Sequence, residues 1–428
     1  MAVDRRCIVE MALSVEDPRA TAAPWAGGRT ILVVTPTVPA PDRSGFDGRV
    51  HHLVEGLAVR HSVTVLCGAM PGDEQVVRRL RSRCRVLTVA ATRPSRLAKR
   101  AAQALALARG GSWEWGHLHS AAMESALHSV MARDRFDVVQ LESCRMGTLS
   151  LPGGIPVVVD EHNVESELLQ RTAAVESSPG RRAYARAEAV RLGRAESDLW
   201  RRCAGCAVTS ERDAAAIRRE APGVPVEVVH NGVDVVAWRP APLPEAGPPH
   251  LVFTGTMNYR PNTDAAVHLV RDILPLLRLR MPQVRVTICG QDPPAAVRSL
   301  AGPGVVVTGR VDDVRPVVAS ADVVVVPLRI GAGTRLKVLE AMAAGRPVVS
   351  SSLGCEGIDV IPGRHVLVAD GVATFAAAVN QAVQDRALAA ELAGAGRALV
   401  ERRYSWEAAV RRLEWLHARV LAAAAPAR

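Results

Sequence analysis

The sequence predicts an α/β protein with two doubly wound domains, and two observations lead to this prediction. The chain has 428 residues, whereas a typical domain has about 100 to 200, so two domains are the natural expectation. Short apolar runs rich in β-branched residues alternate with helical stretches from residue 29 onward, and the alternation pauses near residues 230–250 before it restarts. Short continuous apolar runs are typical of parallel strands that helices cover on both faces.

The first domain is expected over residues 29–240. Its predicted strands are the apolar runs at 31–35, 63–66, 86–89, 138–141, 157–159 and 207–209. Helical stretches separate these runs, as in a doubly wound sheet. Residues 1–28 carry several charges and lack an unbroken apolar core, so we expect a disordered extension there and not a signal peptide.

The second domain is expected over residues 241–405. A linker candidate precedes its first strand, because turn residues at 230–234 are followed by a proline-rich stretch up to residue 249. Its predicted strands lie at 251–254, 284–288, 305–308, 323–326, 348–350 and 366–368. Pro275 should kink or end the helix over 267–281. Residues 406–428 form a last helix, which we expect to pack back towards the first domain.

The composition excludes several classes of protein. The net charge is +10, but Lys99 and Lys337 are the only lysines, so the basic balance reflects a chain-wide use of arginine. Aromatic residues make up only 3% and the arginines are spread along the chain, so nucleic-acid binding is not predicted. No run of about 18 uncharged apolar residues occurs, so no membrane span is predicted.

The eight cysteines form no regular framework. Cys203 and Cys206 make one CxxC without a second pair, so we expect buried thiols and not a zinc or redox site. Such cysteine usage fits a reducing, cytoplasmic location. No grouping of His, Asp and Glu at ligand spacing is visible, so no metal site and no cofactor are predicted.

The most informative segment is residues 327–350, with the sequence PLRIGAGTRLKVLEAMAAGRPVVS. It follows a predicted buried strand, and Gly331 and Gly333 let the backbone come close to a ligand. A helix should begin near Thr334 and end at Gly345. The free N–H groups at such a helix start suit phosphate.

Three charged side chains on this helix point to a nucleotide. Arg335 and Lys337 put two cations at a helix start, where acids are normally preferred, and this makes sense if an anion lies in front of them. Glu340 lies further along an otherwise apolar helix and needs partners, which the paired hydroxyls of a ribose would supply. The same residues also fit an ordinary strand–helix turn with solvated arginines and a surface glutamate.

The segment resembles the signature of the retaining glycosyltransferases of the GT-B fold, in particular the large family 4 (group 1). The resemblance covers residues 29 to about 420. It includes further motifs in order, namely the loop at 44–48, DEHNVE at 160–165, TSERD at 209–213, NGVD at 231–234, FTGTMN at 253–258 and TGRV at 308–311. The resemblance implies two Rossmann-like domains that face each other across a cleft, with donor and acceptor between them.

The resemblance also implies an activity and a set of site residues. The enzyme would move a sugar from a UDP-, GDP- or dTDP-sugar to a hydroxyl acceptor. His162 would hydrogen-bond the transferred sugar, and Arg335 and Lys337 would complete the catalytic group. The donor would be bound by Gly45, Arg260, Arg310, Val311, Gly331, Ala332, Gly333, Thr334 and Glu340.

Two departures from the family pattern stand out. Ala332 replaces the earlier of two glutamates, so a carboxylate contact to the donor sugar is absent. Thr256 stands where an arginine is expected, and Pro261 or Asn262 stands where a lysine is expected. We therefore expect Arg335 and Lys337, together with Arg260, to meet the charge of the diphosphate.

The implied mechanism needs no metal ion. Charge builds on the β-phosphate as the glycosidic bond breaks, and fixed cations stabilise that charge in the transition state. The family retains the anomeric configuration, which fits attack from the same face. A different GT-B enzyme, such as a nucleotide-sugar epimerase, is the alternative interpretation.

The acceptor is left open by the sequence. A saccharide, a lipid-linked saccharide or a small molecule would each fit an enzyme of carbohydrate or cell-envelope biosynthesis. Residues 78–109 are rich in arginine, and Val76, Val77 and Leu80 provide an apolar side. A basic amphipathic surface can dock on anionic lipid. The stretch is therefore interpreted in two ways, as a site of peripheral contact with the inner face of a membrane or as a solvated, arginine-rich surface.

Overall fold

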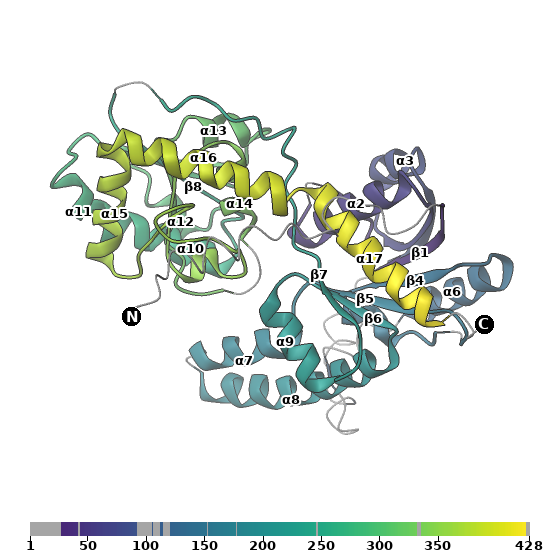
Figure 1. Cartoon of the computed structure of the whole chain (residues 1–428). Coiled ribbons are helices and arrows are strands. Elements are labelled where there is room, and N and C mark those ends of the chain that lie inside the picture. The colour runs from purple at the N-terminus through teal and green to yellow at the C-terminus, as the bar shows by residue number, and fades with distance from the viewer. Residues whose placement is uncertain are drawn as a thin grey trace, which may run out of the picture. The chain divides into compact units, whose positions relative to one another are not determined.

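Figure 1 shows a computed structural model of the chain. It describes residues 27–41, 43–91, 105, 112–113, 120–151, 153–176, 178–244, 247–331 and 335–424. The chain divides into two compact units, of which the first comprises Met1–Val229 with Glu407–Arg428 and the second His230–Trp406. Most of the predicted N-terminal extension lies outside the described residues.

The first unit is built on a seven-stranded parallel sheet in the order β3-β2-β1-β4-β5-β6-β7. Its strands are β1 (Thr30–Thr35), β2 (Ser62–Ala69), β3 (Arg85–Ala90), β4 (Val138–Glu142), β5 (Val157–Glu161), β6 (Gly205–Val208) and β7 (Val226–Val228). The strand order reverses between β1 and β4. In an open α/β sheet this is the point where ligands bind, at the carboxyl ends of the strands.

Helices connect these strands. They are α2 (Gly45–Ala58), α3 (Glu74–Arg81), α6 (Ala121–Arg133), α7 (Glu165–Val175), α8 (Pro179–Arg202) and α9 (Glu211–Glu220), with a 3-10 turn η2 (Cys144–Thr148). The C-terminal helix α17 (Trp406–Ala424) also packs in this unit (Figure 1). A methyl group added at Gly56 of α2 would lie 2.4 Å from the Val410 side chain, and one at Gly205 would lie 2.8 Å from that of Val420. Small residues therefore let α17 lie close to both elements.

The second unit repeats the architecture with six parallel strands in the order β10-β9-β8-β11-β12-β13. They are β8 (His250–Thr254), β9 (Arg285–Cys289), β10 (Val305–Gly309), β11 (Val323–Val326), β12 (Val348–Ser350) and β13 (Leu367–Val368). Here the order reverses between β8 and β11. The prediction of two doubly wound α/β domains is confirmed by these two sheets.

The helices of the second unit are α10 (Arg260–His268), α11 (Leu274–Arg278), α12 (Ala295–Arg298), α13 (Arg315–Ala319), α14 (Leu336–Ala343), α15 (Val372–Gln384) and α16 (Arg386–Arg403), with a 3-10 turn η4 (Leu353–Cys355). A π-helical turn, η3 (Leu269–Ile273), joins α10 to α11. Pro275 lies in the first turn of α11, where its missing N–H costs no hydrogen bond. The irregularity expected at this proline is thus the π-helical turn that precedes it.

Residues 230–240, predicted to close the first domain, belong to the second unit. Val233 and Trp238 are buried in its core. The guanidinium of Arg397 donates a hydrogen bond to the Val235 carbonyl (2.9 Å) and another to the carbonyl of Trp238. The proline-rich stretch therefore starts after the chain has already joined the second unit.

Other details differ from the sequence prediction or complete it. Strand β7 was not predicted, because its three residues include only two apolar ones. Cys203 and Cys206 are buried as expected, and burial raises the pKa of the Cys203 thiol to about 12. Among the described helices, none combines the length and the apolar character needed to cross a membrane.

The basic stretch at residues 78–109 lies largely outside the described residues. Its described part includes the last four residues of α3, in which Leu80 is buried within the first unit. Of the neighbouring apolar residues, Val77 is buried and Val76 is half-buried. Leu105, further along the stretch, is 50% exposed, and contact with a membrane stays a prediction.

Candidate active site

The turn from β11 to α14 carries the most diagnostic residues, and it lies at the strand-order reversal of the second sheet. β8 pairs directly with β11, so the loops that follow these two strands are neighbours at the carboxyl edge. The β8 loop begins at Gly255 and leads to α10, and the β11 loop leads to α14. Residues 332–334, which include the predicted site residues Ala332, Gly333 and Thr334, lie outside the described residues.

Lys337 and Asn262 join these two loops. The Lys337 ammonium donates a hydrogen bond to Asn262 Oδ1 (2.7 Å), and the Asn262 amide donates to the Thr256 carbonyl (2.9 Å). A Cβ at Gly255 would lie 2.8 Å from Lys337 Nζ and 2.7 Å from Asn262 Nδ2. Only glycine leaves room for this arrangement. Asn262, one of the two residues that stand where the family usually has a lysine, therefore holds a lysine supplied by α14.

Arg335 brings a second cation to the same place. It is 8% exposed and directly precedes α14, which starts at Leu336 and not near Thr334 as predicted. A Cβ at Gly331 would lie 2.8 Å from an Arg335 guanidinium nitrogen and 3.5 Å from Pro261. Arg335 thus lies over Gly331, beside the start of α10.

The lowered pKa of Lys337 indicates a site that would be stabilised by a bound anion. Burial and, to a smaller extent, the nearby Arg335 lower the pKa of Lys337 while Glu340 raises it, and the net result is a pKa of about 7. The ammonium also lies 4.3 Å from the centre of the Phe253 ring. A bound diphosphate would favour the charged lysine and restore its proton.

Glu340 lies one turn after Lys337 on α14 and is half-buried. Burial raises its pKa to about 7, which the charge of Lys337 partly offsets. Among the described residues, none hydrogen-bonds its carboxylate. This carboxylate is therefore available to accept hydrogen bonds from a ligand.

The other predicted donor residues are arranged less closely. Arg260 is exposed at the first position of α10, two residues before Asn262. Arg310 is exposed and Val311 is half-buried; both follow β10, which β9 separates from β8 in the sheet. Within the described part of the chain, no hydrogen bond or ion pair joins Arg310 or Val311 to Lys337 or Glu340.

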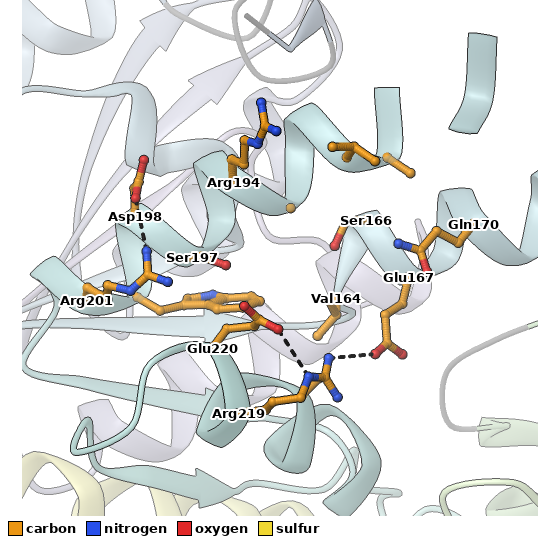
Figure 2. A pocket seen from close by; sticks show the side chains of 15 residues that line it. Val164, Ser166, Glu167, Gln170, Arg194, Ser197, Asp198, Arg201, Arg219 and Glu220 are labelled. Atoms are coloured by element: carbon orange, nitrogen blue, oxygen red, sulfur yellow. Dashed lines mark hydrogen bonds and ion pairs between the residues drawn. The ribbon is translucent and has the colours of Figure 1, made fainter. Parts of the chain in front are cut away.

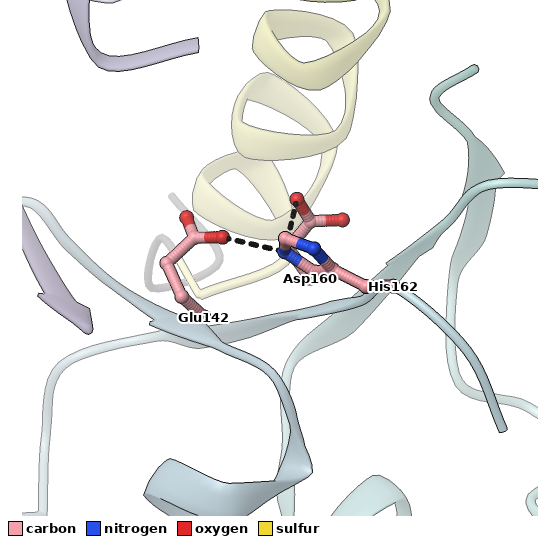
Figure 3. A group of neighbouring side chains, drawn as sticks. All are labelled: Glu142, Asp160 and His162. Atoms are coloured by element: carbon pink, nitrogen blue, oxygen red, sulfur yellow. Dashed lines mark hydrogen bonds and ion pairs between the residues drawn. The ribbon is translucent and has the colours of Figure 1, made fainter. Parts of the chain in front are cut away.

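In the first unit, His162 follows β5 and is held by a group of buried charges (Figure 3). Its Nε2 lies 3.0 Å from Glu142 Oε2 and 3.6 Å from Asp160 Oδ2. The side chain is 10% exposed, whereas both carboxylates are fully buried. Glu142 ends β4 and pairs with Asp160 of β5 in the sheet register, which is why the two acids meet at one ring.

Arg49 of α2 compensates the charge of Asp160. Its Nε and one terminal nitrogen donate to the two carboxylate oxygens at 2.9 and 2.8 Å, and both side chains are at most 1% exposed. Desolvation alone would raise the pKa of Asp160, but the charges of Arg49 and His162 outweigh it and hold that pKa below its usual value. Asp160 is therefore ionised.

The start of α2 also touches the histidine. The rings of Phe46 and His162 stack with their centres 4.4 Å apart and their planes at 28°. Gly45, predicted to lie in a loop, is instead the first residue of α2, because the Ser44 hydroxyl caps the helix by accepting from the Asp47 N–H (3.1 Å). The free amides of this helix start therefore lie next to the His162 turn, in a place that suits an anion.

Glu142, Asp160 and His162 could in principle hold a metal ion, since their ligand atoms lie within 4.8 Å of one another. The sequence did not reveal this grouping, because Glu142 comes from a different strand. However, both oxygens of Asp160 are engaged by the Arg49 guanidinium, a cation that an incoming metal ion would have to displace. The donor set thus fits a charge-compensated histidine better than a metal centre.

A separate pocket of about 500 Å³ lies in the first unit between α7, α8 and α9 (Figure 2). Its lining includes buried apolar residues such as Val164 and Trp200. Three arginines and three acids also line it, including the ion pairs Arg201–Asp198 and Arg219–Glu220. Charges of both signs around an apolar floor suit a neutral molecule with many hydroxyl groups.

Sequence reasoning missed Glu142, Arg49, Phe46 and the role of Asn262. The strand register brings Glu142 to His162, and the packing of α2 brings Arg49 and Phe46 there. Arg49 could have been predicted from the sequence. It lies on the apolar face of a helix, one turn after the helix start, and a buried arginine there needs a buried acid as its partner.

Two family models match the chain. "Glycosyltransferase Family 4" matches residues 44–236, and "Glycosyl transferases group 1" matches residues 248–385. Among curated proteins, the chain is 31% identical to the glycogen synthase of Mycobacterium tuberculosis over 42% of this chain and 45% of that protein. It is 33% identical to the phosphatidyl-myo-inositol mannosyltransferase of Mycolicibacterium smegmatis over 44% of this chain and 50% of that protein. The alignments thus span about half the length of these relatives.

Solved structures share the fold over nearly the whole chain. The sucrose-phosphate synthase of Thermosynechococcus elongatus superposes with a TM-score of 0.68 at 19% identity and covers 92% of this chain and 100% of that one. Anabaena HepE in complex with UDP superposes with a TM-score of 0.63 at 14% identity over 90% and 98%. With the two family models in succession along the two units, the chain belongs to the family 4 (group 1) glycosyltransferases of the GT-B fold.

Proposed function

We propose that the protein is a retaining glycosyltransferase that moves a sugar from a nucleotide diphosphate sugar to a hydroxyl acceptor. The observation that carries this proposal is the junction of Lys337, Asn262 and Arg335 at the strand-order reversal of the second sheet, with the carboxylate of Glu340 one turn away. The two cations would bind the diphosphate of a nucleotide, and the carboxylate one turn away would bind the hydroxyl groups of its ribose.

The comparisons support a nucleotide sugar as the donor. HepE was solved with UDP and with UDP-glucose, and TarM with UDP and a glycosylated glycerol. We carry the donor class over to this chain, as a UDP-, GDP- or dTDP-sugar of the hexose type. The acceptor class is a saccharide, a lipid-linked saccharide or a small molecule, and the charge-balanced pocket of the first unit suits the saccharide.

The proposed mechanism depends on preorganised charge. As the bond to the leaving nucleotide breaks, negative charge grows on the β-phosphate, where Lys337 and Arg335 already lie in a partly desolvated place. Fixed charges there stabilise the transition state more than the ground state. In the first unit, His162 hydrogen-bonds the transferred sugar, and the amides at the start of α2, with Gly45, approach the donor.

Retention and metal independence complete the proposal. Same-face attack is the proposed course, in line with the resemblance to the retaining family. Arg335 and Lys337 would take the place that a divalent ion would fill beside the diphosphate. We also propose a cytoplasmic location, in keeping with the seven free cysteines of the described residues.

A two-step experiment tests this function. Thermal-shift measurements against UDP-, GDP- and dTDP-sugars should single out one nucleotide, since binding to the folded state raises the apparent stability. Transfer from that donor should then give a product with the donor's anomeric configuration, as read by proton NMR, at the same rate with EDTA. An inverted product, a requirement for divalent metal, or isomerisation of the sugar on its nucleotide would contradict the proposal.

The pH dependence of donor use should reflect Lys337 and Glu340. Above about pH 7 Lys337 loses the charge that meets the diphosphate. Below about pH 7 Glu340 gains a proton, so that one of its oxygens becomes a donor and its strength as an acceptor falls. The value of kcat/KM for the donor should therefore be bell-shaped with a maximum near neutrality, the two limbs belonging to the coupled pair.

The Glu340→Gln variant separates the two limbs. It should lose the acid limb and shift the alkaline limb to lower pH, because Glu340 normally raises the pKa of Lys337. Initial rates between about pH 5.5 and 9 measure both effects. A variant profile that matches the wild-type profile would disprove the assignment.

A further inference from the structure

The imidazole of His162 has two distinct nitrogen atoms, and only one of them is engaged by the protein. Nε2 faces the oxygens of Glu142 (3.0 Å) and Asp160 (3.6 Å). Among the described residues, none hydrogen-bonds Nδ1. The ring is therefore anchored at one atom, and the other is available to a ligand.

The hydrogen-bond partners of Glu142 make it an acceptor towards this histidine. Burial raises the pKa of Glu142, whereas the hydrogen bonds with His162 and Gln140 and the charge of His162 act against that rise. Its second oxygen, Oε1, accepts a hydrogen bond from the Gln140 amide (2.6 Å). Gln140 and Glu142 are both on β4 and point to the same side of the strand, two residues apart. With Oε1 held by a donor, Oε2 is the oxygen that remains for the ring.

Asp160 strengthens the same preference. Its charge is retained because Arg49 pairs with both of its oxygens. A bare lone pair on Nε2 would then face two carboxylate oxygens and be repelled by them, whereas an N–H is attracted by both. The ion pair between Arg49 and Asp160 therefore favours a proton on Nε2 of His162, in addition to stabilising the fold.

The remaining ionisable group near this cluster adds no charge. His417 of α17 is fully buried, and burial lowers its pKa to about 3, with His61 lowering it further. It is neutral at physiological pH, so Arg49 is the permanent cation beside the two carboxylates. Phe46, stacked on the ring of His162, restricts rotation of the imidazole.

We propose that Glu142 is a positioning residue that fixes His162 with a proton on Nε2, so that Nδ1 is the atom presented to the substrate. That the substrate is the transferred sugar rests on the proposed function. The assignment of the proton to Nε2 does not rest on it, because the assignment follows from residues of the first unit alone. Turning the ring by half a turn would exchange the places of Nε2 and Cε1 and those of Nδ1 and Cδ2. The carboxylates would then face a C–H group, and the free nitrogen would leave its present place.

Nitrogen-15 NMR tests the assignment without any substrate. Long-range proton–nitrogen spectra of the full-length enzyme labelled in histidine should be recorded between about pH 6 and 8.5, with His162→Gln identifying the His162 signals. In the neutral ring, Nε2 should show the chemical shift of a protonated nitrogen and Nδ1 that of an unprotonated nitrogen. A proton on Nδ1 with a lone pair on Nε2 would overturn the proposal.

The Glu142→Gln variant tests the cause, with Glu414→Gln as a matched control. Glu414 is equally buried and binds a different histidine, His61, at 2.9 Å. Glu142→Gln should give a mixture of both protonated forms of His162, whereas Glu414→Gln should leave the His162 signals unchanged. An unchanged pattern in folded Glu142→Gln would overturn the role of Glu142.

Two further measurements complete the test. If Glu142→Gln fails to fold, Gln140→Ala removes only the donor to Glu142 and should shift the same signals less. With a donor established, Glu142→Gln should lower kcat about ten- to a hundredfold with little change in KM, as expected when a reacting group is misplaced. If no nucleotide sugar is a substrate, the proposed function fails while the NMR result still decides the position of the proton.

Discussion

Replacing Lys337 with alanine should lower kcat about ten- to a thousandfold, the range expected for loss of one preorganised electrostatic stabiliser. The ammonium is held by Asn262 Oδ1 at 2.7 Å, at the strand-order reversal where the diphosphate is proposed to lie. Its charge is therefore in place before the leaving group forms. Steady-state transfer rates with the donor found in the thermal-shift screen measure the effect.

Two further variants make this result specific. Lys337→Met keeps most of the side-chain volume and should lose activity as alanine does, which separates the charge from packing against Phe253. Lys99→Ala removes the other lysine of the chain and should leave kcat unchanged. Wild-type values of kcat in both Lys337 variants would contradict the proposal that this residue binds the diphosphate.

Replacing Arg49 with alanine should lower the free energy of unfolding by about 3–5 kcal/mol, because it leaves the buried carboxylate of Asp160 without its partner. Both side chains are at most 1% exposed and joined by two hydrogen bonds. Urea denaturation measures the loss, and hydrogen exchange should locate it in β5 and α2 of the first unit. Local exchange is needed because a chain of two units need not unfold in one step.

Arg329 provides the matched control. It makes the same two-bond pair with Asp264 at 2.7 and 3.0 Å, but its side chain is 50% exposed. Arg329→Ala should therefore cost only about 0–1 kcal/mol. Equal losses in the two variants would contradict the view that burial sets the energy of the Arg49 pair. The double variant Arg49→Met with Asp160→Leu should be less damaging than Arg49→Ala, since neither charge is left alone.

The sequence predicted most of the fold because its strands are continuous runs of β-branched residues. Both sheets consist of the predicted runs with small changes at their ends, and β7 was missed because Val226–Val228 is short and contains a glutamate. The family resemblance predicts a loop at residues 44–48, whereas the Ser44 cap starts helix α2 there.

The candidate site was predictable only where its residues are close in sequence. Arg335, Lys337 and Glu340 lie within one short segment, so a single motif showed all three. Glu142 and His162 are 20 residues apart, and only the register of β4 against β5 brings them together. Asn262 stood out as a departure from a family pattern, but its hydrogen bond to Lys337 depends on the pairing of β8 with β11.

The placement of α17 has a consequence for how the chain is made. The first unit is completed by residues that leave the ribosome only after the whole of the second unit. Until then, Gly56 and Gly205 lack the side chains of Val410 and Val420 that pack on them, and His61 lacks Glu414. During synthesis the second unit is therefore the first that can close, and a shorter chain ending at Val229 would expose an unfilled apolar face.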